Sequence, residues 1–223
     1  MREIVLDTET TGLSPKGGDR VVEIGCVELV NHILTGESYH VYVNPERDMP
    51  DEAFQVHGLS EAFLEKHSVF AAVAGDFLSF IGDAKLIIHN ASFDMGFLNA
   101  ELERLGQATI PMSRSIDTVQ MARARFPGAQ ASLDALCRRF EIDNSARTKH
   151  GALLDAELLA EVYLELIGGR QPGLELASSG GVTQARQSAE RPFRPARPHA
   201  ASREELEAHA ALVDTLKDPI WRQ

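Results

Sequence analysis

The sequence predicts an α/β protein with a mixed central sheet flanked by helices, followed by a flexible linker and a short helical tail. Apolar, β-branched segments come first and then alternate with helical patterns, at residues 4–6, 21–30, 33–43, 86–88 and 115–118. The chain has 223 residues, 43% of them hydrophobic, which is enough for one folded domain and additional segments. Residues 178–200 are rich in Gly, Ser, Pro and Arg, a composition typical of a linker.

These features divide the chain into three parts. A folded domain is expected over residues 1–170, because a Gly-Gly pair ends the last long helical pattern of that region. A linker follows over residues 171–200, and a tail takes residues 201–223. The order of the strands in the sheet does not follow from periodicity.

The first polar motif follows the first predicted strand. An apolar run reaches Leu6, and Asp7 and Glu9 come directly after it. Side chains of a strand alternate between its faces, so Asp7 and Glu9 point to one side and Thr8 to the other. A lone acid here would be read as the cap of a turn, but two like charges on one face repel unless a cation lies between them.

The second motif lies at the start of a predicted helix that ends near Gly106, with Ser92 as its expected N-cap. Asp94 is in helical register with three apolar residues, so its carboxylate is expected to face inward with Phe97, Leu98 and Leu105. The alternative is an acid favoured at the first turn by the helix dipole.

The third motif belongs to a strongly amphipathic helix. Its polar stripe is formed by Glu157, Glu161 and Glu165, and its apolar stripe by Leu158, Leu159, Val162 and Leu166. Asp155 falls within the apolar stripe, where an ionised carboxylate needs a metal ion or a positive partner. His150 would lie about 140° from Asp155 on a continuous helix, at roughly 100° per residue. We therefore expect His150 in the loop before the helix.

Four carboxylates and one imidazole are the groups that two-metal cleavage of a phosphodiester requires. The motifs also resemble those of a known family, the DEDDh exonucleases, in DTET at 7–10, HNASFD at 89–94 and HGALLD at 150–155. Along the whole chain, the sequence is similar to the proofreading (epsilon) subunits of bacterial DNA polymerase III. The resemblance implies a ribonuclease-H-like fold and a 3′→5′ exonuclease that releases nucleoside 5′-monophosphates from DNA.

The resemblance also implies roles for individual residues. Two divalent cations, Mg²⁺ or Mn²⁺, would be held by Asp7, Glu9, Asp94 and Asp155, with His150 as general base. The segment DEAFQVHGLS resembles the part of the family that touches the terminal nucleotide, and this nominates Glu52 and His57 beside Asp7, Glu9 and Asp155 as substrate-binding residues. The alternative for Glu52 and His57 is a capped helix with a surface histidine.

Two segments beyond the domain suggest partners. Within the hexapeptide 171–176, Gln171, Leu174 and Leu176 resemble the motif that docks replication proteins on the sliding clamp; the alternative is a simple linker. In the tail, Ser202 and Glu205 have capping-box spacing, so a helix is expected with an apolar stripe of Leu206, Ala210, Val213 and Leu216. Together with Trp221, the stripe resembles the segment that binds the polymerase catalytic (alpha) subunit. A further small core subunit is also possible in such a complex.

The net charge of −11 is unusual for a protein that handles nucleic acid, and we expect weak intrinsic DNA binding and dependence on a partner. Cys26 and Cys137 lie in apolar stretches, as expected for free thiols in the cytoplasm. The sequence shows no signal peptide or membrane span. Two other functions remain open: a stand-alone DEDDh exonuclease acting on RNA or short oligonucleotides, and a non-catalytic adaptor that bridges clamp and polymerase.

Overall fold

The computed structural model describes residues 1–145, 147, 149–168, 200–215 and 217. The chain separates into two compact units, one within residues 1–175 and one within residues 176–223. Gln171, Leu174, Leu176 and Trp221 lie outside the described residues, so their predicted partner contacts remain predictions.

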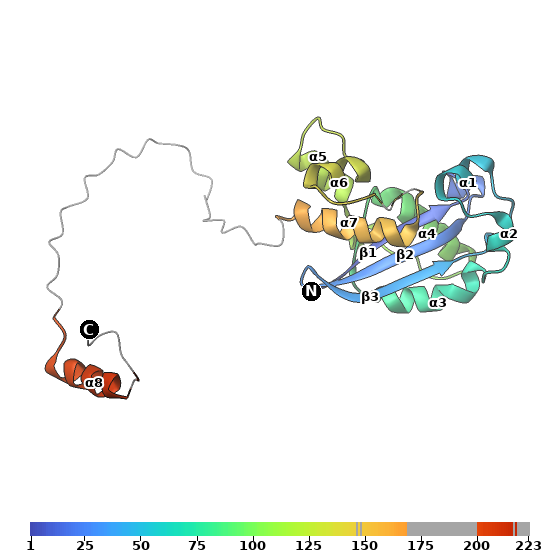
Figure 1. The fold of residues 1–223 in the computed structure, drawn as a ribbon. Helices are drawn as coiled ribbons and strands as arrows, with labels where there is room; N and C mark the ends of the chain where they lie inside the picture. Colours follow the sequence, from blue (N-terminus) through green and yellow to red (C-terminus); the bar gives the residue numbers. More distant parts are fainter. Residues whose placement is uncertain (146, 148, 169–199, 216, 218–223) are drawn as a thin grey trace. The chain divides into compact units, whose positions relative to one another are not determined.

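The first unit is built on a mixed five-stranded sheet in the order β3-β2-β1-β4-β5 (Figure 1). The strands are β1 (Arg2–Thr10), β2 (Val21–Val30), β3 (Ile33–Tyr42), β4 (Lys85–Ile88) and β5 (Ser115–Asp117). The pairs β1–β2 and β2–β3 are antiparallel, whereas β1–β4 and β4–β5 are parallel. The predicted fold class is confirmed, and the predicted strands lie where the sequence placed them.

Helices connect and cover these strands. They are α1 (Asp51–His57), α2 (Glu61–Leu64), α3 (Phe70–Ile81), α4 (Ala91–Arg104), α5 (Thr118–Arg125), α6 (Leu133–Phe140) and α7 (Ala152–Leu166), with two 3₁₀ turns at Pro15–Gly17 and Met112–Arg114. Within the described residues, none of the helices is both long and apolar enough to span a membrane.

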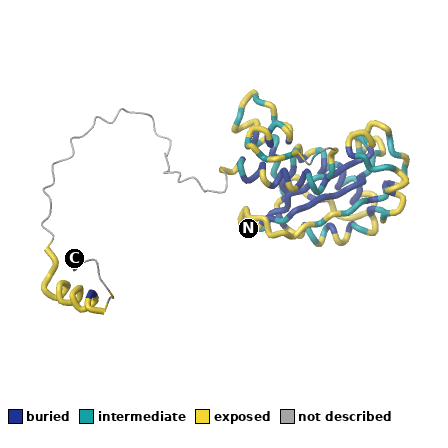
Figure 2. Tube along the Cα trace, in the orientation of Figure 1, coloured by how far each residue is buried: buried dark blue, intermediate teal, exposed yellow. Residues whose placement is uncertain are grey.

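The sheet separates two hydrophobic layers, and β1 contributes to both of them. Ile4 and Leu6 pack with α3 and α4, whereas Val5 packs on the opposite face with α6 and α7. Figure 2 shows the central strands buried along most of their length, while the outer loops are exposed. By the same alternation, Asp7 and Glu9 continue the face of Val5 toward α7, and Thr8 continues the face of Ile4 and Leu6 toward α4.

Gly25 allows α7 to lie directly on the sheet. It is paired with Asp7 in the β1–β2 ladder. A Cβ atom at Gly25 would lie only 2.2 Å from the carbonyl carbon of Ala152 and 2.3 Å from the amide nitrogen of Leu153. Because only glycine leaves this space, the first turn of α7 lies against β2 beside Asp7, and Asp155 is brought to the same place.

The helix that carries Asp94 begins differently from the prediction. Ser92 is inside α4, and the N-cap is Asn90, whose backbone is left-handed with φ of 70°. Asparagine tolerates this conformation, and the amide of Asn90 donates to Asp117 Oδ1 at 3.3 Å. The inward position expected for Leu105 is also wrong, since this residue follows the last residue of α4 and is 36% exposed.

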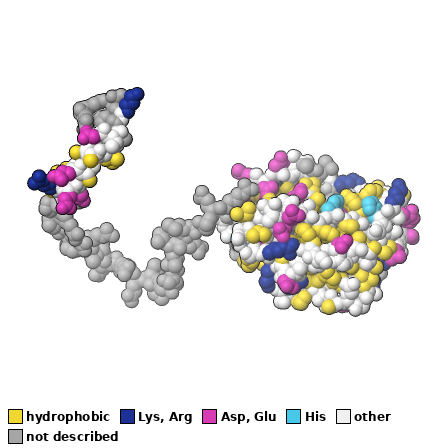
Figure 3. Space-filling view, turned by 90° about the horizontal axis from the view of Figure 1, so that it is seen from below, with side chains coloured by type: hydrophobic (Ala, Val, Ile, Leu, Met, Phe, Trp, Pro, Cys, Tyr) yellow, Lys and Arg dark blue, Asp and Glu magenta, His cyan; other side chains and the backbone are white. Residues whose placement is uncertain are grey.

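The second unit contains α8 (Arg203–Asp214) in its described residues. The predicted capping box is present, with Ser202 and Glu205 each accepting from the other's backbone amide. Figure 3 shows hydrophobic side chains along α8 and acidic side chains near its start. Leu206 is 58% exposed, whereas Val213 is buried, and Leu216 lies outside the described residues.

Candidate active site

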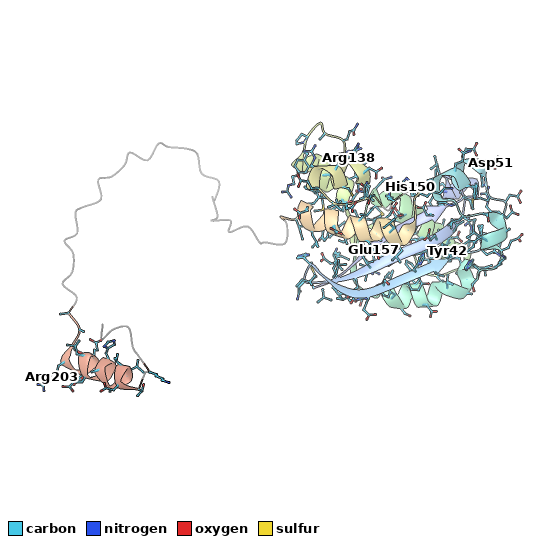
Figure 4. The ribbon with its side chains drawn as sticks, viewed as in Figure 1. Tyr42, Asp51, Arg138, His150, Glu157 and Arg203 are labelled. Carbon is cyan, nitrogen blue, oxygen red and sulfur yellow. The ribbon has the colours of Figure 1, made fainter. Side chains whose placement is uncertain are left out.

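The predicted site residues line one open cleft with a volume of about 1290 Å³. The cleft lies where β1 ends, between α1 and the pair α5–α6. Figure 4 shows His150 between the helix that carries Arg138 and the helix that begins at Asp51. All seven predicted residues of the domain line this cleft: Asp7, Glu9, Glu52, His57, Asp94, His150 and Asp155.

The β1 acids are placed in surroundings that oppose their ionisation. Burial, with repulsion from Asp94, Glu9 and Asp155, raises the pKa of Asp7 well above its ordinary value. Burial, with repulsion chiefly from Asp155 and Glu23, raises the pKa of Glu9 to about 8. Such crowding of carboxylates on one face is stabilised by a cation bound between them.

Asp94 approaches from the other face of the sheet. The strands β1 and β4 are paired as far as Val5. Further along β1, the Thr8 amide donates to Asp94 Oδ1 at 3.0 Å. The Thr8 hydroxyl donates to the same oxygen at 2.7 Å. Burial raises the pKa of Asp94 to about 7 although these hydrogen bonds lower it. Thr8 therefore fixes Asp94 against the strand that carries the other two acids.

Asp155 occupies the buried position on α7 that the helical pattern indicated, and it has a positive partner. Arg147 donates from Nε to Asp155 Oδ1 at 2.5 Å and from Nη2 to Asp155 Oδ2 at 2.6 Å. Burial would raise the pKa of Asp155, yet the hydrogen bonds from Arg147 and the proximity of His150 hold this pKa below its ordinary value. The ionised form of Asp155 is thus favoured in this arrangement, whereas the surroundings of Asp7 and Glu9 oppose theirs.

His150 lies before α7, whose N-cap is Gly151, so the predicted loop position is confirmed. Its ring Nδ1 is 3.4 Å from Asp155 Oδ2 and accepts from Arg147 Nη2 at 2.8 Å. The backbone amide of His150 donates to the carbonyl of Val56 on α1 at 3.2 Å. The ring lines the cleft and is 49% exposed, so solvent can reach it.

Glu52 and His57 belong to α1, which forms the wall of the cleft opposite α5 and α6. Glu52 is exposed in the first turn of α1, whereas His57 is 94% buried at its end, so the reading of His57 as a surface histidine is wrong. The Leu59 amide donates to His57 Nδ1 at 3.0 Å, which leaves the proton of the neutral ring on Nε2. Burial lowers the pKa of His57. The backbone of Thr10 is close enough to raise this pKa in part, but Nε2 makes no hydrogen bond of good geometry with the described residues.

The donor set fits hard divalent cations. Ligand atoms of Glu9, His150 and Asp155 all lie within 4.8 Å of one another. Carboxylate oxygens dominate the set, and these are the ligands that Mg²⁺ and Mn²⁺ prefer. The half-buried Asp7 and the buried Asp94 add two more carboxylates to the same cleft. Bound cations would relieve the repulsion that raises the pKa of Asp7 and Glu9.

Two contributors to the site were not identified as such from the sequence. Arg147 is the positive partner that the buried Asp155 required, and its position three residues before His150 was the available signal. Thr8 was assigned only to the opposite face of the strand, yet it orients Asp94 from there. Both contacts join residues from different segments, which local spacing does not reveal.

Known proteins resemble this chain over most of its length. The exonuclease family model RNase_T matches residues 4–163. The DNA polymerase III subunit epsilon of Rickettsia felis is 56% identical over 186 residues, which covers 82% of this chain and 81% of that protein. The Escherichia coli DNA polymerase III subunit epsilon is 45% identical over 238 residues, which covers 99% of this chain and 97% of that protein.

Solved structures show the same fold. Exonuclease X in complex with 5′ overhanging duplex DNA superposes with a TM-score of 0.59 at 24% identity, over 74% of this chain and 90% of that chain. The nuclease domain of 3′hExo, a DEDDh family member bound to rAMP, superposes with a TM-score of 0.65 at 18% identity, over 74% of this chain and 91% of that chain.

Proposed function

Because this chain belongs to the exonuclease family of bacterial DNA polymerase III epsilon subunits, we propose that its cleft removes nucleotides one at a time from the 3′ end of DNA, and so proofreads for a replicative polymerase. The observation that carries the proposal is the convergence of Asp7, Glu9, Asp94, His150 and Asp155 from three distant segments in one cleft. The products would be nucleoside 5′-monophosphates and a strand shorter by one residue.

We assign two divalent cations, Mg²⁺ or Mn²⁺, to the four carboxylates, mainly to Asp7, Glu9 and Asp155, with Asp94 contributing directly or through water. When bound, such cations supply Lewis acidity and neutralise the charge that develops on the phosphate and the leaving oxygen. The requirement for a cation follows from charge, since four clustered carboxylates by themselves would repel a phosphate backbone.

His150 acts as the general base in this proposal. Its imidazole lies beside Asp155, on a loop that is held to α1 by the bond from its amide to Val56. A ring nitrogen takes the proton of the attacking water as the phosphorus–oxygen bond forms and the 3′-oxygen leaves. Asp155 stays ionised and stabilises the imidazolium that results.

Glu52 and His57 are proposed to hold the terminal nucleotide. The buried Nε2–H group of His57 is a donor at the wall of the cleft that makes no hydrogen bond of good geometry with the described residues. A buried donor of this kind is costly unless something accepts its proton, and an oxygen of the substrate would do so. Glu52, which is exposed at the same wall, would accept from a sugar hydroxyl or an amino group.

The polymerase and the clamp are proposed partners outside the domain. We assign residues 201–223 to the polymerase catalytic (alpha) subunit, and residues 171–176 to the sliding clamp; a further small core subunit is compatible with both. The exposed apolar side chains of α8, among them Leu206 and Leu212, support the first assignment. A cytoplasmic location belongs to the same proposal, and Cys26 and Cys137 are buried free thiols, as it requires.

One assay separates this function from its two rivals. Release of nucleotide is measured from mismatched and paired DNA ends, with and without Mg²⁺, and from an RNA strand of the same sequence. The proposal predicts Mg²⁺-dependent release that is faster from mismatched ends. Preference for RNA would indicate a stand-alone exonuclease, and no release from any strand would indicate an adaptor.

A further inference from the structure

Arg147 lines the cleft and contacts two of its proposed catalytic residues, but it has no role of its own in the proposed reaction. Its side chain is only 7% exposed, and three of its nitrogens donate to groups of the cleft. Nε and Nη2 bind the two oxygens of Asp155, Nη2 also reaches His150 Nδ1 at 2.8 Å, and Nη1 donates to Asp134 Oδ1 at 2.7 Å. One guanidinium thus occupies both a carboxylate and an imidazole on which the reaction depends.

These contacts conflict with the binding of a cation. A guanidinium has no lone pair, so it binds only as a donor, and both oxygens of Asp155 are directed at it. A divalent cation at Asp155 needs at least one of these oxygens. Arg147 occupies one lone pair on each oxygen of Asp155, and its positive charge repels a divalent cation at the same carboxylate, so the two compete for this position. His150 Nδ1 accepts from Arg147, so the neutral ring carries its proton on Nε2 and has no free lone pair for a proton from water in this arrangement.

We propose that Arg147 is a displaceable internal counter-ion, which holds Asp155 and His150 in a resting state and competes with divalent cations for Asp155. This inference rests on the proposed use of metal at the same cleft. Asp134, whose side chain is 52% exposed at the rim, provides a second partner that Arg147 already contacts, so release from Asp155 does not leave a bare buried charge. When no cation is bound, the ion pair between Arg147 and Asp155 neutralises the buried negative charge of Asp155.

The alternative is a purely structural role, in which Arg147 orders the loop before α7 and stays on Asp155 throughout. The two roles predict opposite effects of removing the guanidinium. A structural residue would weaken cation binding when it is lost, because the loop and Asp155 would become less ordered. A competitor would strengthen cation binding when it is lost, because Asp155 would be free.

Cation affinity tests the proposal without any cleavage. Mn²⁺ binding to the full-length protein is measured by electron paramagnetic resonance and calorimetry for wild type, Arg147→Gln and Arg123→Gln. Arg123 lines the same cleft and is exposed, so it controls for the loss of one positive charge. We expect Arg147→Gln to bind Mn²⁺ at least about tenfold more tightly than wild type, since two charge-assisted hydrogen bonds no longer compete.

Equal or weaker binding by Arg147→Gln than by Arg123→Gln would overturn the proposal. If neither wild type nor Arg147→Gln bound Mn²⁺ at all, the proposed function would fail together with this inference. If all three proteins bound Mn²⁺ equally well, Arg147 would not compete with the cation, but the proposed function would be unaffected.

A second measurement covers the case in which Arg147→Gln is poorly folded. The Nε–H resonance of Arg147 in the wild-type protein, assigned by its loss in Arg147→Lys, is followed by nuclear magnetic resonance during titration with diamagnetic Mg²⁺. We expect it to move toward the position of a free guanidinium as Mg²⁺ saturates the protein. A resonance that stays unchanged at saturation shows that Arg147 is not displaced and contradicts the proposal.

Discussion

His150 lies in the loop before α7, outside the helix that carries Asp155, and its exposed ring reaches the acids of the cleft. We expect His150→Ala to lower kcat by about 10²–10⁴, the usual contribution of a general base, while Mn²⁺ affinity is largely kept. Single-turnover cleavage of a 3′-labelled strand measures the first quantity, and calorimetry the second. His67→Ala, which removes a histidine outside the cleft, should cleave normally; equal loss in both variants would argue against a base at His150.

Asp155 differs from His150 because it is expected to hold the cation itself. Asp155→Ala should lose Mn²⁺ affinity and cleavage together, whereas Glu157→Ala, which changes an exposed acid two residues further along α7, should lose neither. Calorimetric titration with Mn²⁺ and the cleavage assay are made on the same preparations. Normal Mn²⁺ affinity in Asp155→Ala would contradict the assignment.

Glu9 makes the stability of the protein depend on pH. Its pKa in the folded protein is about 8, against 4.5 ordinarily, so the folded state keeps a proton that the unfolded chain has released. The free energy of unfolding without divalent cations should therefore fall as pH rises from about 4.5 to about 8. Asp94, with a pKa of about 7, acts in the same direction.

Urea unfolding at a series of pH values in a chelating buffer measures this dependence. Glu9→Gln should reduce the slope, because it removes the titrating group, and saturating Mg²⁺ should counteract the fall by favouring the ionised carboxylates. A wild-type slope that is flat, or that Glu9→Gln leaves unchanged, would show that the burial of Glu9 does not govern its titration.

At the scale of elements, the packing of α7 on β2 decides whether the cleft forms. Gly25→Ala would place a methyl group against the backbone of Ala152, and such overpacking typically costs about 1–3 kcal/mol. We expect lower stability in urea and a loss of cleavage larger than the loss of folded protein. Gly75→Ala, on the exposed side of α3 with no atom within 4 Å of the new methyl group, should be neutral or stabilising. If the two substitutions had equal effects on stability and cleavage, the packing at Gly25 would not be what forms the cleft.

The periodicity of the sequence predicted most of these elements. The strand ranges and the inward positions of Asp94 and Asp155 follow from the pattern of apolar and polar residues, and the structure agrees. The loop position of His150 follows from its angular separation from Asp155 on a helix, and the structure agrees there too. The strand order did not follow, because hydrogen-bond partners far apart in sequence leave no local pattern. Arg147 was not assigned a role for a similar reason, since a long side chain reaches Asp155 and Asp134 from a loop without periodicity.

At the scale of the whole molecule, the nuclease and the tail should be separable. The structure divides the chain into units within residues 1–175 and 176–223, and the carboxylates all lie in the first. Deleting residues 178–223 should leave the degradation of single-stranded DNA intact and abolish co-purification with the polymerase. Loss of both properties together, in a truncated protein shown to be folded by circular dichroism, would contradict this division.

The net charge of the whole molecule also affects its affinity for DNA. The face seen in Figure 3 carries acidic and basic side chains scattered among hydrophobic ones, rather than one continuous basic surface. With a net charge of −11, affinity for a strand should come mainly from the cleft, its cations and the partner that delivers the 3′ end. The isolated protein should therefore bind DNA weakly even where cleavage is efficient.

Anomalous diffraction from crystals soaked in Mn²⁺ and a nucleoside 5′-monophosphate tests the assignment of the cleft most directly. We expect two manganese peaks within ligand distance of Asp7, Glu9 and Asp155, with the phosphate bound beside them and His150 facing it. If saturating Mn²⁺ gave no peak at these three carboxylates, the cleft would not be the metal site of a nuclease.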